Sequence, residues 1–257
     1  MIVIDSGLGG ISVVRALRAA RPGMALTYLA DTAGFPYGKR SAADIGARAI
    51  ALLRAATATE APGAVVVACN TLSTLCLDAL RAAFTFPFVG TVPAVKVAAQ
   101  LSVTRRFTLL ATPNTAQSTY SANLIAQFAQ GCVVDCYGAP NLAAMAERML
   151  LGERVDAAAL AAELAPAFTD DARGKTDAVV LGCTHYPLIM DALTAAAPWP
   201  VRWVDSGEAI ARRALAQADV PPARSVAYVT RAADVPRYRD LFTREGFEVV
   251  EVLLAVD

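Results

Sequence analysis

The chain has 257 residues, 56% of them hydrophobic, and its 23 basic and 23 acidic residues cancel. This length and apolar content exclude a disordered polypeptide and supply side chains for one large or two smaller cores. A net charge of zero predicts no nucleic-acid partner and no attraction to an acidic membrane surface. Polar residues interrupt every apolar run before the roughly 20 residues of a membrane span, and no signal-peptide pattern precedes the first strand. We therefore expect a cytoplasmic protein.

Predicted strands and helices alternate along almost the whole chain. Strands are expected at residues 1–5, 26–31, 64–68, 88–90, 107–111, 132–137, 178–182, 201–204, 225–230 and 249–253. Helices are expected from 11, 41–56, 73–84, 92–101, 116–128, twice within 141–168, at 187–196, and again between the last strands. Alternation of this kind is typical of parallel sheets covered by helices on both faces. The sequence therefore predicts an α/β fold with doubly wound sheets.

One pattern occurs twice, as AVVVACNT at 64–71 and as AVVLGCTH at 178–185. Each copy is a short run rich in β-branched residues, typical of a buried parallel strand, that stops at a cysteine followed by small polar side chains. Ligands of open α/β sheets bind at the carboxyl ends of strands. We therefore predict two pseudosymmetric domains, with an active site in the cleft between them and one thiol, Cys69 or Cys183, on either side.

The end of the chain is expected to return to the first domain. The triplet at 205–207 repeats the Asp-Ser-Gly of 5–7, and the strand and helix pattern resumes after it. We predict a discontinuous first domain formed by residues 1–92 plus 205–257, and a second domain formed by residues 93–204.

A pair of thiols facing across a cleft suits proton transfer from one face of a carbon atom to the other. Racemisation needs a base on one face and an acid on the opposite face, and a cysteine with a pKa of roughly 8.5 serves as either. Either cysteine alone is readily explained as a small buried hydrophobe. The parallel setting of Cys69 and Cys183 favours the chemical interpretation, whereas Cys76 is expected in the core and Cys132 and Cys136 are given no role.

Other polar residues lie where strands are predicted to end. Ser6, Asn70, Thr71 and Thr184 are candidate hydrogen-bond donors to a substrate carboxylate. His185, the single histidine, is a candidate to orient or tune Cys183. One histidine and no Cys-x2-Cys pair predict no metal site. A pyridoxal-phosphate enzyme remains an alternative and would need one of three lysines, Lys39, Lys96 or Lys175.

Several motifs carry a resemblance to a known family. They are DSGLGG at 5–10, Asp31 with PYG at 36–38, ACNT at 68–71, VPA at 92–94, TPNT at 112–115 with Ser118, and LGCTHYP at 181–187. With these motifs in order, the chain resembles the glutamate racemases of the cofactor-independent aspartate/glutamate racemase superfamily. The resemblance implies interconversion of L- and D-glutamate for peptidoglycan synthesis, with no cofactor and no metal, by a homodimer.

The resemblance also implies roles for individual residues. Cys69 would deprotonate D-glutamate and Cys183 would deprotonate L-glutamate, with Asp5 and His185 assisting the two thiols. Glu147 is the counterpart of a further assisting glutamate, although the neighbouring residues 136–140 depart from the family pattern. The substrate-binding residues would be Asp5, Ser6, Pro36, Tyr37, Gly38, Asn70, Thr71, Thr115, Thr184 and His185.

Two alternatives to glutamate racemisation also remain. An aspartate racemase, or another racemase of the superfamily, would share both thiols, because the side-chain pocket that separates these substrates is not readable from the sequence. A binding module that uses the same cleft without catalysis is the alternative outside enzymes.

Overall fold

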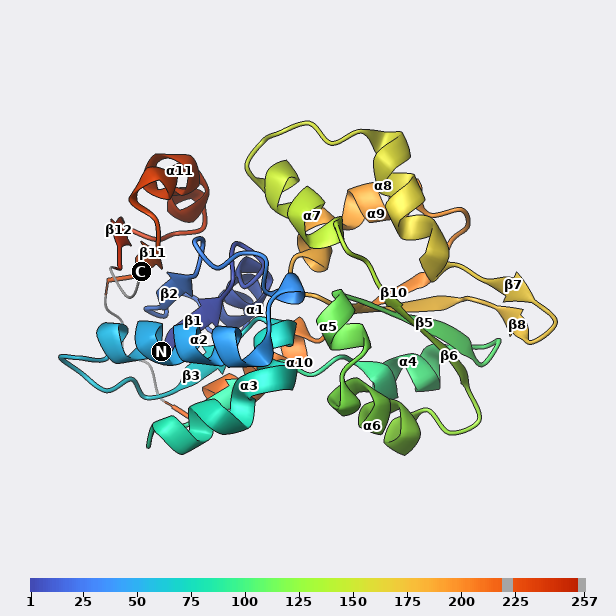
Figure 1. Ribbon diagram of the computed structural model, residues 1–257, viewed down its shortest axis with the longest axis horizontal. Helices are drawn as coiled ribbons and strands as arrows, with labels where there is room; N and C mark the ends of the chain where they lie inside the picture. The colour runs from blue at the N-terminus through green and yellow to red at the C-terminus, as the bar shows by residue number, and fades with distance from the viewer. Residues whose placement is uncertain (219–223, 254–257) are drawn as a thin grey trace. The chain divides into compact units, whose positions relative to one another are not determined.

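The computed structural model describes residues 1–218 and 224–253 (Figure 1). The chain divides into two compact units, Met1–Thr91 with Gly207–Asp257, and Val92–Ser206. Residues 219–223 and 254–257, part of the segment 205–257 that we expected in the first domain, lie outside the description. Each unit is built on a parallel sheet, which confirms the predicted α/β class. No helix in the described part of the chain is long and apolar enough to cross a membrane.

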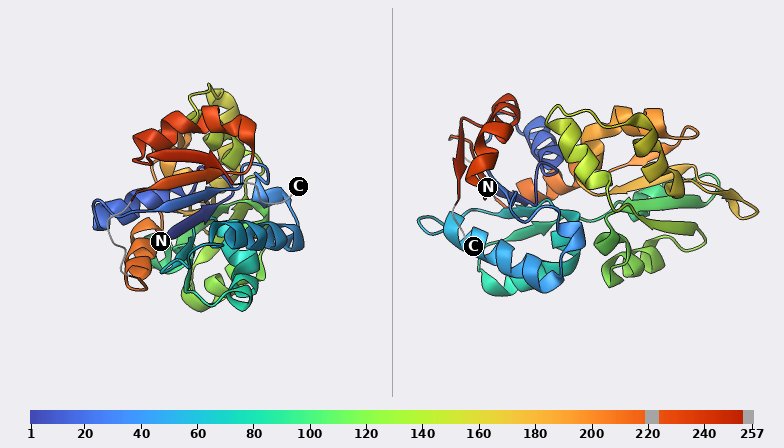
Figure 2. Two further views of the ribbon diagram at one scale, coloured as in Figure 1. Left: turned by 90° about the vertical axis from the view of Figure 1, so that its left-hand side faces the viewer. Right: turned by 45° about the horizontal axis from the view of Figure 1, so that its top comes forward.

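The first unit contains a six-stranded parallel sheet with the order β12-β11-β2-β1-β3-β4. Its strands are β1 (Ile2–Asp5), β2 (Thr27–Ala30), β3 (Val65–Val67), β4 (Phe88–Gly90), β11 (Val226–Val229) and β12 (Val249–Val252). Its helices are α1 (Ile11–Ala20), α2 (Ala42–Ala56), α3 (Asn70–Ala83), α10 (Gly207–Leu215) and α11 (Val235–Arg244), with 3-10 turns η1 (Tyr37–Lys39) and η4 (Ala232–Asp234). The last two strands extend the sheet beyond β2, so the end of the chain completes this unit, as Figure 2 shows.

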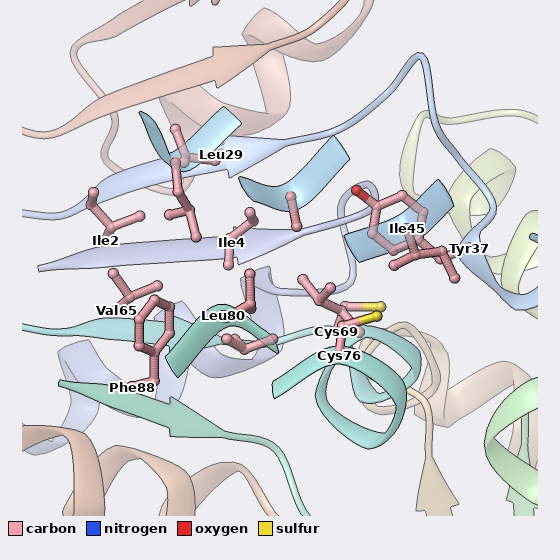
Figure 3. Close-up of a cluster of buried hydrophobic side chains, with 14 residues drawn as sticks. Ile2, Ile4, Leu29, Tyr37, Ile45, Val65, Cys69, Cys76, Leu80 and Phe88 are labelled. Carbon is pink, nitrogen blue, oxygen red and sulfur yellow. The ribbon is translucent and has the colours of Figure 1, made fainter. Parts of the chain in front are cut away.

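The two faces of this sheet are covered by different helices. Ile2 and Ile4 of β1 pack with α2 and α3 in a core that also includes Cys69 and Cys76 (Figure 3). Side chains alternate between the faces of a strand, and Tyr28 of β2 accordingly packs against aromatic rings of α11 and the loop after it. Cys76 is buried in this core, as predicted.

The second unit contains a four-stranded parallel sheet with the order β10-β9-β5-β6. Its strands are β5 (Arg106–Ala111), β6 (Val133–Gly138), β9 (Ala178–Gly182) and β10 (Arg202–Val204). Its helices are α4 (Val95–Leu101), α5 (Pro113–Ala116), α6 (Thr119–Phe128), α7 (Leu142–Leu150), α8 (Ala157–Leu164) and α9 (Met190–Ala196), with 3-10 turns η2 (Ala165–Ala167) and η3 (Tyr186–Ile189). Alternate residues of β5 belong to two separate cores. Leu110 packs with α7, α8 and α9, whereas Leu109 packs with α4 and α6.

A small hairpin in the second unit was not predicted from the sequence. Its strands are β7 (Asp170–Asp171) and β8 (Gly174–Lys175). Arg106 at the start of β5 is 1% exposed and forms ion pairs with Asp135 of β6 and with Asp171 of the hairpin. A fully buried guanidinium needs such partners. An ion pair with Arg106 therefore holds the hairpin against the sheet.

Both sheets follow one strand order, and this places the two cysteines equivalently. In chain order within each unit, the strands lie second, first, third and fourth, as β2-β1-β3-β4 and β6-β5-β9-β10. The order reverses direction between the first and third strands, and this is where ligands of doubly wound sheets bind. Cys69 and Cys183 each follow the third strand of their sheet.

The helix after Cys69 begins earlier than the sequence predicts. We expected it from Ser73, but α3 begins at Asn70 because β3 already ends at Val67 and Cys69 takes the extended N-cap conformation, with φ −65° and ψ 118°. The N-terminus of a 14-residue helix therefore lies directly at the thiol.

The close packing of β9 under Cys183 can be tested with a pair of glycine variants. A Cβ atom at Gly182 would lie 2.9 Å from Ala111 Cβ and 3.2 Å from the Leu110 carbonyl oxygen. Gly182→Ala should therefore lower the free energy of unfolding by about 1–3 kcal/mol, measured by urea denaturation. In the control Gly46→Ala, within α2, the nearest atom is Cys76 Sγ at 3.6 Å, so the variant should be stabilised by up to about 1 kcal/mol. Equal changes in the free energy of unfolding for Gly182→Ala and Gly46→Ala would contradict the close packing around Gly182.

Candidate active site

The first cluster of predicted site residues lies at the carboxyl ends of β1 and β3, which pair in parallel. Cys69 is 6% exposed, and its Sγ lies 3.9 Å from Ser6 Oγ. Asp5 is buried at the end of β1, where its Oδ1 accepts a hydrogen bond of 2.8 Å from the Gly7 N–H. The structure thus brings Asp5, Ser6 and Cys69 together, as the strand pairing requires.

The first turn of α3 adds two more predicted residues to this cluster. Asn70 and Thr71 are both buried there. Asn70 Oδ1 is buried and has no hydrogen-bond partner among the described residues, although such an atom is normally paired. Unpaired N–H groups and the helix dipole favour an anion at a helix N-terminus. This end of α3 therefore suits a thiolate at Cys69 and a substrate carboxylate beside it.

The predicted residues 36–38 are held by a buried carboxylate at the end of β2. Pro36 precedes the turn η1, its peptide bond with Phe35 is cis, and Tyr37 and Gly38 are buried within the turn. The Tyr37 hydroxyl donates a hydrogen bond of 2.7 Å to Asp31 Oδ2. Asp31 therefore holds the Tyr37 side chain in place within the turn η1.

Asp31 has three further partners, on α2, at the end of β11 and in its own loop. The Arg48 guanidinium of α2 donates to both carboxylate oxygens at 2.7 Å, Thr230 Oγ1 at the end of β11 donates at 2.9 Å, and the Gly34 N–H donates at 3.2 Å. Burial alone would raise the pKa of Asp31, but the hydrogen bonds from Arg48 and Tyr37 and the charge of Arg48 hold it below its ordinary value. The Tyr37 pKa is raised well above its ordinary value by burial first and then by the charge of Asp31. The pair is thus a carboxylate and a neutral phenol.

Arg48→Met tests this buried ion pair. It would leave the Asp31 charge without its cation and lower the free energy of unfolding at pH 7 by about 3 kcal/mol, measured by urea denaturation. In the wild type the lowered pKa makes the carboxylate stabilising above its ordinary pKa, and this contribution disappears as the pH falls. In Arg48→Met no cation compensates the burial of Asp31, so the pKa of this carboxyl should rise. The difference in unfolding free energy between wild type and variant should therefore shrink between pH 7 and pH 4, as Asp31 of the variant takes up a proton.

The control for that measurement is Arg81→Met on α3. Arg81 pairs at 3.4 Å with Asp78, whose side chain is 99% exposed, and an exposed pair of this kind contributes less than about 1 kcal/mol. A deficit in Arg48→Met that stays constant with pH, or that matches the control, would contradict the description of the Asp31 network.

The second cluster lies at the end of β9, where Cys183, Thr184 and His185 are all buried. His185 Nδ1 lies 3.8 Å from Cys183 Sγ, and its Nε2 lies 2.6 Å from Glu147 Oε2. Glu147 is buried on α7, a helix that covers the same face of the sheet as Cys183. The structure thus connects thiol, imidazole and carboxylate in one chain of contacts.

The protonation of His185 follows from these contacts. Burial would lower its pKa, but the hydrogen bonds with Cys183 and Glu147 and the negative charge of Glu147 raise it well above the ordinary value. His185 is therefore an imidazolium at neutral pH, with one N–H toward Glu147 and the other toward the sulfur. An imidazolium beside a thiol favours the thiolate.

Thr115 lies at the neighbouring strand end of the same sheet. β5 pairs with β9 through Ala111 and Gly182, so the segment after Ala111 and the segment that contains Cys183 begin at the same edge. Thr115 is fully buried, and its Oγ1 accepts a hydrogen bond of 3.1 Å from Thr112 Oγ1. This hydroxyl is therefore held in place beside the end of the sheet.

Glu147→Gln tests the pairing with His185, and the single histidine of the chain makes the NMR assignment unambiguous. We expect the wild-type imidazole to titrate well above its ordinary pKa of about 6.5 and the variant imidazole to titrate at lower pH, since burial is then opposed only by Cys183. Because the folded-state pKa is raised, the pair stabilises the fold fully below pH ~6.5 and loses this effect as the pH rises.

Glu153→Gln is the matched control in the same unit. Its carboxylate pairs with Arg148 and its side chain is 39% exposed, so the His185 titration should not change. If the titration midpoint of His185 stays the same in Glu147→Gln, the pairing of His185 with Glu147 is refuted.

Sequence reasoning did not find Arg48, Thr230 or Tyr186. Arg48 and Thr230 stand in a helix and at a strand end with no motif around them, and only tertiary folding brings them to Asp31. Tyr186 was visible inside the LGCTHYP motif, yet no role was assigned to it.

Of the three lysines considered for a pyridoxal-phosphate enzyme, two lie over aromatic rings and one belongs to the turn of Tyr37 and Gly38. Lys96 Nζ lies 5.7 Å from the centroid of the Phe128 ring and Lys175 Nζ lies 4.2 Å from that of Trp199, whereas Lys39 ends η1. In the described residues, no group of three or more His, Cys, Asp or Glu side chains is arranged to hold a metal ion.

The chain is similar in sequence and in fold to known proteins. Residues 11–214 match the model of the Asp/Glu/Hydantoin racemase family. A glutamate racemase from Brucella canis is 45% identical over 226 residues, which are 88% of this chain and 80% of that protein. The crystal structure of Escherichia coli glutamate racemase in complex with L-glutamate and an activator, UDP-MurNAc-Ala, has a TM-score of 0.92 and 37% identity, and the match covers 100% of this chain and 98% of that one.

A second solved structure extends the comparison. Glutamate racemase from Thermus thermophilus, in complex with β-chloro-D-alanine, has a TM-score of 0.74 and 29% identity, with 98% of this chain and 94% of that one covered. The fold and these similarities define an isomerase of the amino-acid racemase class. The chain belongs to the Asp/Glu/Hydantoin racemase family.

Proposed function

We propose that this racemase interconverts L- and D-glutamate by moving the α-proton between the thiols of Cys69 and Cys183. The observation that carries the proposal is that a buried cysteine follows the third strand of each parallel sheet, next to polar side chains. Relatives from Brucella and Escherichia coli that are named glutamate racemase support glutamate as the substrate.

The proposed reaction is a balanced exchange of one proton. With L-glutamate bound, the Cys183 thiolate takes the α-hydrogen as a proton, so that the C–H bond breaks and an S–H bond forms. The thiol of Cys69 then donates its proton to the opposite face of the carbanion and becomes the thiolate. D-glutamate reacts in reverse, with Cys69 as the base and Cys183 as the acid.

The residues around each thiol assist its ionisation in different ways. The imidazolium of His185, held by Glu147, stabilises a negative charge on Cys183. The N-terminus of α3 and the hydroxyl of Ser6 stabilise a charge on Cys69. We propose that Asp5 assists proton transfer at Cys69 in the way that His185 assists it at Cys183.

The substrate would be held by the remaining predicted residues. The unpaired Oδ1 of Asn70 is an acceptor suited to the α-ammonium group, and the N–H groups at the start of α3 suit the α-carboxylate. We propose that residues 36–38 contribute through the turn that Asp31 holds, and that Thr184 and Thr115 contribute from the second unit. This assignment requires both clusters to contact one substrate molecule.

Aspartate is the competing substrate, and the family description includes it. Incubation of the protein with each enantiomer of both amino acids in heavy water, without added cofactor, distinguishes the two. We expect deuterium at the α-carbon of glutamate and a change of its optical rotation, at a kcat/KM well above that for aspartate. Preferred turnover of aspartate, or tight glutamate binding without any exchange, would reject the proposal.

We further propose that the product D-glutamate supplies peptidoglycan synthesis in the cytoplasm, and that the enzyme is a homodimer. Expression of the chain should restore growth of a bacterial strain that requires D-glutamate, and a Cys69→Ser, Cys183→Ser double variant should not. Sedimentation of the purified protein measures the oligomeric state.

Single cysteine variants separate a two-base mechanism from a one-base mechanism. In Cys69→Ser and in Cys183→Ser we expect racemisation to fall by about 10²- to 10⁴-fold in both directions, because each direction needs one thiol as base and the other as acid. The remaining thiol should still exchange the α-hydrogen on its own face. Cys69→Ser should therefore exchange L-glutamate, and Cys183→Ser should exchange D-glutamate, without inversion.

Cys76→Ser is the control, because this thiol is buried in the core and donates to the Ala42 carbonyl oxygen. Racemisation by Cys76→Ser should stay close to the wild-type rate. Full activity in either active-site variant, or exchange of the same enantiomer in both, would exclude the two-thiol mechanism.

A further inference from the structure

Tyr186 carries a buried polar atom that the mechanism above does not use. The side chain is fully buried in the second unit, and its hydroxyl oxygen has no hydrogen-bond partner among the described residues. A buried hydroxyl without a partner costs roughly 1–3 kcal/mol relative to a satisfied one. A tyrosine in this position therefore calls for a physical explanation, since phenylalanine would fill the same space.

The chain holds Tyr186 close to Cys183. It lies three residues after the cysteine, and its backbone N–H donates a hydrogen bond of 3.2 Å to the Cys183 carbonyl oxygen. Both side chains belong to one buried cluster with Leu142 and Ala146 of α7 and Leu164 of α8. The Tyr186 side chain is fully buried in this cluster, so a protein group is the expected partner of its hydroxyl.

Glu163 of α8, whose charge acts on Tyr186, already has hydrogen-bond partners of its own. The carboxylate of Glu163 on α8 accepts hydrogen bonds from the N–H groups of Asn141 and Leu142 at the start of α7, and its backbone carbonyl accepts from the Tyr137 hydroxyl at 2.9 Å. The sulfur of Cys183 is close enough to the Tyr186 hydroxyl to influence it through a hydrogen bond, although the two groups do not meet ordinary hydrogen-bond geometry.

The charges around Tyr186 keep its hydroxyl protonated. Its pKa is raised well above the ordinary value by burial first, and then by the negative charges of Cys183 and Glu163 and by Tyr137 of β6. The sulfur also lies 3.8 Å from His185 Nδ1, and His185 Nε2 contacts Glu147 of α7. The raised pKa keeps the Tyr186 hydroxyl protonated at neutral pH, so it can act as a donor to the sulfur.

We propose that Tyr186 is a positioning residue whose hydroxyl donates a hydrogen bond to the Cys183 sulfur when that sulfur becomes a thiolate. A neutral thiol is a weak acceptor, whereas hydrogen bonds to an ionised group are shorter and roughly twice as strong as neutral ones. Ionisation of Cys183 gives the hydroxyl its missing partner and so recovers the cost of its burial. The relevance of this bond to catalysis rests on the proposed function, in which Cys183 acts as a base.

The experiment is a thiolate titration that needs no substrate. In the full-length protein, the rate of alkylation of each cysteine by iodoacetamide is measured from pH 5 to pH 10 by mass spectrometry of the peptides. In Tyr186→Phe we expect the midpoint for Cys183 to rise by about one pH unit, a tenfold loss of thiolate below the midpoint. The midpoint for Cys69, in the other unit, should not move, which makes it an internal control.

Two further measurements separate positioning from a structural role. Because the hydroxyl has no partner of ordinary hydrogen-bond geometry among the described residues, Tyr186→Phe should melt at the same temperature as the wild type, or higher, below pH 6, well under the ordinary cysteine pKa of roughly 8.5. Tyr137→Phe is the matched variant: it removes a hydroxyl of the same unit that already has a partner, and the Cys183 midpoint should stay in place.

The outcomes are distinct. A Cys183 midpoint unchanged in a folded Tyr186→Phe protein, or an equal shift at Cys69, would overturn the inference. If the wild type does not racemise glutamate, the proposed function fails, while the alkylation midpoints still decide the role of the hydroxyl. If both hold, kcat/KM of Tyr186→Phe at pH 7 should fall about tenfold, equally for the two enantiomers, because the equilibrium constant of a racemisation is one.

Discussion

The structure depends on one constraint of parallel sheets, which is that the carboxyl ends of all strands meet at the same edge. Both units use it with the same strand order, in which the first strand lies beside the third. In the first unit this brings Asp5 at the end of β1 next to the segment that contains Cys69. In the second unit it brings the segment of Thr115 next to that of Cys183. The buried strands fix where the segments that carry these polar residues start, and helices such as α3 begin directly at the strand ends.

The two thiols are in unlike electrostatic surroundings, although their topological positions correspond. Cys69 lies at the start of a long helix, and the groups around it are backbone N–H donors, a hydroxyl and the buried carboxylate of Asp5. Cys183 lies beside an imidazole whose positive charge is held by Glu147. The proposed two-thiol mechanism would need both sulfurs to take up and release a proton with similar ease. Under that proposal, a helix terminus would serve this purpose at one thiol and an ion pair at the other.

Buried polar side chains outside the two clusters connect the ends of several strands. Asp31 joins the end of β2, helix α2 and the end of β11 through Arg48 and Thr230. The segment at the end of β11 therefore helps to hold the turn that contains Tyr37. Arg106 plays a comparable part in the second unit, where it ties a surface hairpin to the sheet. Each network contains a charge that is stable in the interior only while its partners stay in place.

The amino-acid sequence by itself determined the α/β class, most of the strands and helices, and the two cysteine segments, because β-branched runs that end in small polar residues report burial and strand ends directly. It also identified Cys183 and His185 as neighbours, since they lie two residues apart. Tertiary structure alone decided the contact between His185 and Glu147, which are 38 positions apart on different elements. The same holds for Arg48 and Thr230 at Asp31, and for the buried hydroxyl of Tyr186. Periodicity reports which face of an element is apolar, but the partner of a buried polar atom depends on how helices cross the sheet, and no local pattern in the sequence encodes that crossing.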